Sequence, residues 1–252
     1  MNLRRLEEIS QNASRAERGL MLDGWCIGLS PGLAKRSRCV NPFYPSARPF
    51  AENYAVARAA YAAAKLPCIF RITPFCPDAG IDNELAARGF IRFDATLVQL
   101  LTLADWPLAP LRPVQVTFAA QPDLRMAAEW LGEMRGDSAG EIAALSARWH
   151  NSAAKVEAIF AFDATGQRVA RSITITEDGH IGIFDVGTLP QHGNRGYASA
   201  LLAHQLCAAR DSGAHTAYLQ VTPENSSRRI YERFGFRTVY EYGYRALPGE
   251  AI

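Results

Sequence analysis

The sequence predicts a mixed α/β fold in two domains, and three features of its 252 residues support this. Short apolar strand patterns alternate with helical patterns along the chain. A proline-rich segment divides the chain, and a strand–helix–strand pattern occurs on each side of it. Meandering strands followed by a strand–helix–strand unit are typical of a mixed sheet with helices on its faces.

The first half is predicted to alternate helices and strands. The helices are expected over 3–13, 50–65 and 80–89, the last stopped by Gly89. Strands are expected within 18–31 and 35–45, joined by a turn at Pro31-Gly32, and over 67–75 and 91–103.

A linker is predicted at residues 105–113. This segment lies within the stretch "ADWPLAPLRPVQ", where Pro107, Pro110 and Pro113 follow one another closely. Proline neither donates to a strand ladder nor continues a helix. The expected domains are therefore 1–104 and 114–252.

The second half repeats this style with more strands. Strands are expected over 114–120, 155–163, 167–178, 180–189, 215–222 and 236–247, and helices over 124–134, 140–150, 197–206 and 225–235. Turns are expected at 163–166 and at Asp178-Gly179.

An internal repeat is suggested by "IFRITP…LAARGFIRFDATLV" and "YLQVTP…IYERFGFRTVYEYG". Each reads as strand, Thr-Pro, helix, Gly-Phe and strand, which favours a duplicated fold, although this pattern is also common in unrelated proteins. The halves differ in the loop before their longest helix, because only the second half has glycines there.

Composition and charge exclude several classes of protein. The chain is 48% hydrophobic and 21% charged, with a net charge of +2, which argues against a nucleic-acid partner. It has no apolar run of about 20 residues, and the first stretch, "MNLRRLEEISQNAS", is not expected to be a secretory signal because it carries acids and no apolar segment. Five cysteines without C-x-x-C spacing indicate free thiols rather than disulfides or a metal site. We expect a cytoplasmic protein with no membrane partner.

The loop "GNRGYAS" is the first candidate site. The first N–H groups of a helix lack partners, and the helix dipole makes that end positive. Glycines just before the helix let several N–H groups face one anion, so the loop is a candidate phosphate cradle. It matches neither G-x-G-x-x-G nor the P-loop, and an ordinary glycine turn is the alternative.

Two motifs carry a resemblance to a known family. The stretch "GIFDVGTLPQHGNRGYASALLAHQL" resembles the acetyl-CoA-binding motif of the GNAT N-acetyltransferase superfamily, R/Q-x-x-G-x-G/A. Gly196 and Ala198 match it, and Arg195 stands where a basic residue is frequent. Gly193 replaces the first Arg or Gln, and Asn194 replaces a frequent glycine, so a side-chain contact to phosphate at the first position is lost.

The stretch "TPENSSRRIYERFGF" resembles the C-terminal motif of the same family. Ile230, Tyr231, Gly235 and Phe236 fit it, whereas Asn225 lies one residue closer to the tyrosine than the family asparagine. The resemblance covers roughly 114–245. It implies a C-terminal GNAT fold with a mixed, mostly antiparallel central sheet, and a smaller, degenerate GNAT-like N-terminal domain.

The resemblance also implies where the cofactor binds. The backbone at the end of the strand before the loop would pair with the pantetheine arm and could donate to the oxyanion, and the loop with the start of the helix would hold the pyrophosphate. The cofactor-binding candidates are Val186, Gly187, Thr188, Leu189, Gly193, Asn194, Arg195, Gly196, Tyr197, Ala198, Ser199 and Asn225.

The catalytic candidates are a tyrosine and two carboxylates. By resemblance, Tyr231 would protonate the leaving thiolate; a core aromatic is the alternative. The general base in this family is often a carboxylate on a central strand or a water held by one. Asp185 lies in an apolar strand, where a buried carboxylate needs a task or a partner, and Glu157 is the reserve. Asp185 could instead be a side chain that points to the surface of a mixed sheet.

The expected function is transfer of acetyl from acetyl-CoA to a primary amine by direct attack in a ternary complex, with no metal required. The acceptor is expected to be a small-molecule amine or a peptide N-terminus. A non-catalytic acyl-CoA-binding sensor or scaffold, and an inert structural protein, are the alternatives. The sequence does not fix the oligomeric state, for which a homodimer is one candidate.

Overall fold

A computed structural model describes residues 2–31, 34–104, 106 and 113–250. The chain forms two compact units: Met1–Leu97 with Tyr240–Ile252 is the first, and Val98–Val239 is the second. This division differs from the predicted domains, because the last strand begins in the second unit and ends in the first. The predicted linker at 105–113 lies outside the described residues except for Trp106 and Pro113, and it stays a prediction.

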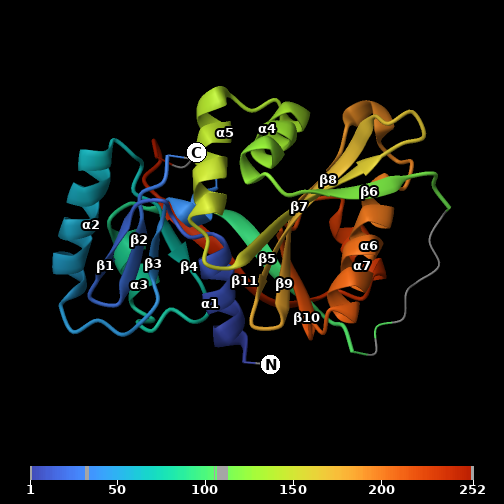
Figure 1. The fold of residues 1–252 in the computed structure, drawn as a ribbon. Helices are drawn as coiled ribbons and strands as arrows, with labels where there is room; N and C mark the ends of the chain where they lie inside the picture. Colours follow the sequence, from blue (N-terminus) through green and yellow to red (C-terminus); the bar gives the residue numbers. More distant parts are fainter. Residues whose placement is uncertain (1, 32–33, 105, 107–112, 251–252) are drawn as a thin grey trace. The chain divides into compact units, whose positions relative to one another are not determined.

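The first unit combines helices with a small mixed sheet (Figure 1). Its described helices are α1 (Leu3–Ala13), α2 (Phe50–Ala64) and α3 (Ile81–Ala87), with a 3-10 turn η1 (Lys35–Ser37). Its strands are β1 (Gly19–Leu22), β2 (Trp25–Gly28), β3 (Val40–Pro42), β4 (Phe70–Ile72), the start of β5 (Ile91–Thr102) and the end of β11 (Arg237–Ala246). Within the unit the order β1-β2-β3-β4-β11 holds, and β3 runs parallel to β4.

One turn of the first unit differs from the prediction. The region 18–31 holds two strands rather than one, because Asp23 and Gly24 form a tight hairpin turn with φ of 43° and 85°. Two successive residues with positive φ are the signature of a type I′ turn, for which Asp-Gly is a favoured pair. A Cβ on Gly24 would lie 2.3 Å from the carbonyl oxygen of Tyr44, so only glycine fits. The sequence already contained this signal, whereas the predicted turn residue Gly32 lies outside the described residues.

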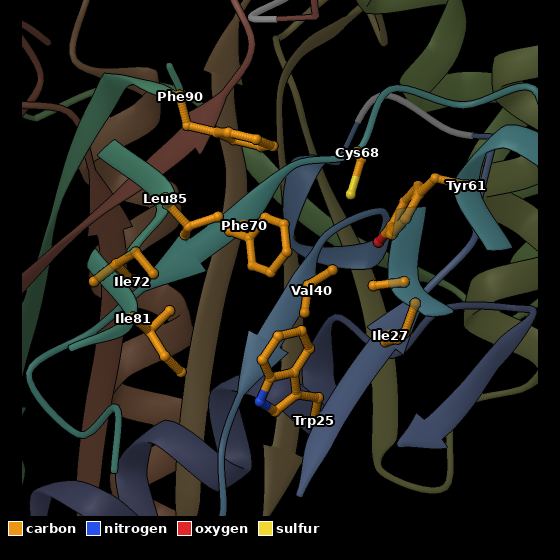
Figure 2. Close-up of a cluster of buried hydrophobic side chains, with 11 residues drawn as sticks. Trp25, Ile27, Val40, Tyr61, Cys68, Phe70, Ile72, Ile81, Leu85 and Phe90 are labelled. Atoms are coloured by element: carbon orange, nitrogen blue, oxygen red, sulfur yellow. The ribbon is translucent and has the colours of Figure 1, made fainter. Parts of the chain in front are cut away.

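The core of the first unit is rich in aromatic side chains, as Figure 2 shows. Trp25 from β2 packs edge-on against Phe70 from β4, with ring centroids 5.6 Å apart, and Phe70 packs edge-on against Phe90 at 5.7 Å. Burying each such side chain stabilises the fold by roughly 1.5–3 kcal/mol. This cluster holds α2 and α3 against the sheet.

The second unit has a larger sheet and the glycine loop. Its helices are α4 (Leu124–Arg135), α5 (Ala139–His150), α6 (Tyr197–Asp211) and α7 (Arg228–Arg233), with a 3-10 turn η2 (Pro190–His192). Its strands, besides the end of β5 and the start of β11, are β6 (Thr117–Gln121), β7 (Lys155–Phe162), β8 (Arg168–Glu177), β9 (His180–Thr188) and β10 (Thr216–Val221). The order is β5-β10-β9-β8-β7-β6, with β9 parallel to β10 and β6 to β9 antiparallel to one another. The predicted mixed, mostly antiparallel sheet is confirmed.

The predicted repeat corresponds to the same order of elements in both units. In the first unit β3, α2 and the parallel strand β4 are followed by α3 and β5. In the second unit β9, α6 and the parallel strand β10 are followed by α7 and β11. A strand–helix–strand crossover between parallel neighbours therefore occurs once in each unit.

Helices cover both faces of the second sheet (Figure 1). Neighbouring residues of a strand point to opposite faces. On β7, Phe160 packs edge-on against Trp130 of α4 at 5.3 Å, whereas the next residue, Ala161, packs in a cluster with Leu201 of α6. Helix α4 therefore covers one face and α6 the other.

A β-bulge interrupts the pairing of β8 with β9. Ile173 pairs with Phe184 and Arg171 with Gly187, so two residues, Asp185 and Val186, face the single residue between them on β8. Asp185 has a φ of 52°, and such left-handed residues occur in bulges that bend a strand. On its other edge β9 pairs with β10 through residues 180–182 and then continues to Thr188 alongside β8. The bulge and the end of this pairing place the last part of β9 beside the glycine loop.

Candidate functional site

A cleft of about 1050 Å³ lies in the second unit, around the glycine loop. Three segments form its walls: the end of β9, the loop with the first turn of α6, and the segment that includes α7. The residues that line it are Val186, Gly187, Thr188, Gly193, Asn194, Gly196, Tyr197, Ala198, Ser199, Leu202, Ser226, Ser227, Arg229, Ile230, Tyr231, Glu232 and Arg233.

Helix α6 begins without a side-chain cap, unlike the helices on the other face. Asp123 caps α4, and Ser138 with Glu141 forms a capping box on α5. The N-cap of α6 is Gly196, which has no side chain to accept a hydrogen bond. Among the described residues, the backbone N–H groups from Asn194 to Ser199 donate no hydrogen bond. The loop therefore leaves free donors at the positive end of a helix.

Two loop residues have the left-handed backbone that shapes this cradle. Gly196 has a φ of 90°, which glycine adopts without strain. Asn194 has a φ of 58°, and asparagine is one of the few other residues that adopt this region readily. The asparagine that departs from the family pattern thus keeps the backbone that a glycine would give. Gly193 has an ordinary φ of −58°.

The end of β9 contributes three of its four predicted residues to the cleft. Val186, Gly187 and Thr188 line it; Gly187 and Thr188 pair on one side with β8, and Val186 lies in the bulge. Leu189 does not line the cleft; its N–H donates to the carbonyl oxygen of Val169 at 3.0 Å. Its predicted role stays without geometric support.

Tyr231 from α7 lies in the cleft wall with the loop and the end of β9. Its hydroxyl has no hydrogen-bond partner among the described residues, and its ring packs edge-on against Phe236 at 6.2 Å. Burial raises the pKa of Tyr231 above its ordinary value. The hydroxyl therefore stays protonated through the neutral range, as a proton donor requires.

The carboxylates are placed differently from Tyr231, because neither lines the cleft. Asp185, at the bulge, accepts a hydrogen bond on Oδ1 from the guanidinium of Arg135 at 3.0 Å, and its side chain is 31% exposed. It is thus only partly buried and has a cationic partner. Glu157, on β7, forms an ion pair with Lys155 at 3.1 Å, and its side chain is 40% exposed. The structure brings neither carboxylate into contact with Tyr231.

Two further predicted cofactor residues, Arg195 and Asn225, are not among the residues that line the cleft. Arg195 lines a separate hollow of about 410 Å³ together with Asp163 and Thr165. Asn225 accepts a hydrogen bond on Oδ1 from the N–H of Ser227 at 2.8 Å, which shapes the turn before α7. The structure thus gives Asn225 a local role, and Arg195 shares its hollow with one other loop residue, Tyr197, which also lines the cleft.

Sequence reasoning missed two arginines of the cleft. Arg229 and Arg233 line it from α7, one helical turn apart. Their signal was the basic pair in "SSRRIYER", directly before the motif tyrosine. Nothing in the sequence alone showed which of the arginines in this segment faces the cleft.

All five cysteines are free thiols, as predicted. In the part of the chain that the structure describes, no helix has the length and apolar character needed to cross a membrane.

The comparisons with known proteins agree with the resemblance. Residues 179–239 match the family described as acetyltransferase (GNAT) domain, so this segment of the chain is similar to a GNAT acetyltransferase domain. This segment includes the bulged strand β9, the glycine loop and Tyr231. No curated protein matches the sequence at a significant level.

Solved structures share the fold at low sequence identity. A GCN5-related N-acetyltransferase from Kribbella flavida is 18% identical, with a TM-score of 0.70, and the match covers 98% of this chain and 95% of that one. A functionally unknown conserved protein from Staphylococcus epidermidis is 15% identical, with a TM-score of 0.63, covering 93% of this chain and 94% of that one. A tandem GNAT protein from the clavulanic acid biosynthesis pathway is 15% identical, with a TM-score of 0.60, covering 82% and 74%. The chain therefore has the fold of the GCN5-related acyl-transfer enzymes, tandem members included.

Proposed function

We propose that the chain is an N-acetyltransferase that moves the acetyl group of acetyl-CoA to a primary amine by direct attack in a ternary complex. The observation that carries the proposal is the uncapped start of α6. Its free N–H groups line the same cleft as Tyr231. A diphosphate needs several donors and positive potential, and this loop supplies both. The acceptor is proposed to be a small-molecule amine or a peptide N-terminus.

The residues of the cleft suit the three parts of the cofactor. The backbone from Gly193 to Ser199 would hold the diphosphate. Val186, Gly187 and Thr188 would pair with the pantetheine arm, and their N–H groups could donate to the carbonyl oxygen as it gains charge. Tyr231 would lie near the sulfur.

The proton transfers can be assigned to two side chains. A neutral amine nitrogen would attack the thioester carbon, and Asp185 would take the proton that this nitrogen loses as the amide forms, directly or through one water. Only one oxygen of Asp185 is held by Arg135, so the other can accept. As the C–S bond breaks, the hydroxyl of Tyr231 would protonate the leaving thiolate. Glu157 is a weaker candidate base, because its carboxylate is exposed to solvent and already pairs with Lys155.

Binding is the first test of this proposal. Purified protein is titrated calorimetrically with acetyl-CoA and with CoA. Micromolar binding of both is the expected result, since such pockets combine backbone donors with buried apolar surface. No binding at millimolar concentration would overturn the proposal. Binding without turnover over a broad set of amines, read as thiol release, would favour the sensor or scaffold.

The variant Tyr231→Phe tests the catalytic part of the proposal. Loss of a general acid is expected to lower kcat by roughly 10²-fold or more. The Kd for CoA should change little, because the ring remains. Tyr197→Phe is the matched control, since it removes a hydroxyl from another tyrosine in the same cleft. Equal losses in kcat and affinity, or no loss, would contradict the role.

A further inference from the structure

Helix α7 presents two arginines to the cleft. Arg229 and Arg233 both line it, and residues four apart lie on the same face of a helix. Both residues are exposed. Their position brings two positive charges to the wall of the cleft that also contains the free N–H groups at the start of α6.

These two guanidinium groups form no ion pair among the described residues. The neighbouring acid Glu232 also lines the cleft, but its carboxylate pairs with Nε of Arg228 at 3.4 Å. The nearest acid on the helix is therefore already partnered by an arginine outside the cleft lining. Arg229 and Arg233 remain available to an anion.

The glycine loop itself brings no cationic side chain to the cleft. Gly193 has no side chain, Asn194 is neutral, and Arg195 lines the separate hollow with Asp163. The cationic side chains that line the cleft thus come from α7. Backbone donors and side-chain charge are supplied by two different elements.

We propose that Arg229 and Arg233 bind a phosphate of CoA and replace the charge that the loop lacks at Gly193. This inference rests on the proposed function. Guanidinium groups bind phosphate oxygens through charge-assisted hydrogen bonds, often with two donors at once. The phosphate is either in the diphosphate or at the 3′ position of the ribose, and both offer the same chemistry.

The test compares CoA binding by the wild type with that of the double variant Arg229→Gln/Arg233→Gln. The Kd for CoA is expected to rise about 10-fold or more, and the difference should shrink at high salt because exposed charges are screened. The double variant Arg125→Gln/Arg210→Gln is the control. It removes the same charge from two arginines of α4 and α6 that do not line the cleft, and its affinity for CoA should be unchanged.

Dephospho-CoA separates the two phosphates. If the arginines bind the 3′-phosphate, the wild type prefers CoA to dephospho-CoA and the double variant does not. If they bind the diphosphate, both ligands lose affinity equally. Either result supports the inference.

A rescue variant gives a second readout. Gly193 has an ordinary φ, so its backbone can carry an arginine. The added Cβ would lie 3.3 Å from the carbonyl oxygen of Pro190, and this contact is relieved if the two atoms move apart by a few tenths of an ångström. Gly193→Arg in the double variant is expected to restore most of the CoA affinity. Wild-type binding of CoA together with equal binding by the double variant would overturn the inference and leave the proposed function standing. Failure of the wild type to bind CoA would overturn both.

Discussion

Arg135 donates to Oδ1 of Asp185 at 3.0 Å, while Oδ2 of the same carboxylate has no partner among the described residues. Arg135 ends α4, and Asp185 lies in the bulge of β9. The ion pair therefore fixes the carboxylate one residue before Val186, where the cleft begins. This geometry suits a base held in place by one oxygen and accepting with the other.

The first prediction concerns this carboxylate. Asp185→Asn keeps the shape and loses the proton acceptor, so kcat is expected to fall by about 10²-fold or more. The KM for acetyl-CoA should stay close to that of the wild type. Arg135→Gln is the comparison, since it removes the partner and leaves the base, and its loss of kcat should be clearly smaller. Equal losses in the two variants would mean that the pair only shapes the α4–β9 contact.

The pH dependence of turnover tests Tyr231. Burial raises its pKa, so the protonated hydroxyl persists above the ordinary tyrosine value of about 10. A general acid acts only when protonated, and kcat is therefore expected to show no fall between about pH 8 and pH 10. A fall in that range that disappears in Tyr231→Phe would show that the pKa is not raised. Tyr197→Phe should keep the wild-type profile.

The cradle itself depends on Gly196. Its φ of 90° strains any residue with a Cβ, and that atom would also lie 3.3 Å from Cγ1 of Val114. Gly196→Ala is expected to lower the free energy of unfolding by roughly 1–2 kcal/mol and to weaken CoA binding. Gly213→Ala is the matched control, because Gly213 has a φ of 85° but lies after α6 and away from the cleft. A similar loss of stability with unchanged CoA binding is expected for the control. Unchanged CoA binding in Gly196→Ala would contradict the cradle.

Local pattern was enough to predict most helices, strands and the glycine loop. The alanine-rich pattern over 50–65 became α2, and the loop that the family motif singled out lies before α6 and lines the cleft, whereas its role as a phosphate cradle stays a prediction. These features depend on residues close together in the sequence. The Asp23-Gly24 hairpin was equally local, and it was missed because the turn was assigned to a later Pro-Gly pair.

The contacts between distant residues could not be predicted from the sequence. The partner of Asp185 is 50 residues away, on another element, and no spacing rule connects the two. Arg195 and Arg229 are both basic residues next to family motifs, yet only Arg229 lines the cleft. The direction of a side chain in a loop or a short helix depends on how that segment packs in the folded protein. The sequence alone does not show this packing.

The last prediction concerns a buried ion pair in the first unit. Glu7 of α1 is fully buried and accepts hydrogen bonds from Arg71 and, at 2.6 Å, from Tyr240. Burial alone would raise the pKa of the Glu7 carboxyl, but the charge of Arg71 and the hydrogen bonds bring it below its ordinary value. A carboxyl with a lowered folded pKa stabilises the fold above its unfolded pKa of about 4.3, and this contribution is lost as the pH falls through the folded value.

Glu7→Gln removes this contribution and leaves the buried charge of Arg71 uncompensated. Breaking such a pair costs about 3–5 kcal/mol. The loss in the free energy of unfolding, measured by urea denaturation, should therefore be larger at about pH 7 than at about pH 3. Glu129→Gln, in an exposed pair with Arg125, should follow the wild type at both values. A loss for Glu7→Gln that is the same at both pH values would mean that folding does not shift the pKa of the Glu7 carboxyl, because stability depends on pH only through groups whose pKa differs between the folded and unfolded states.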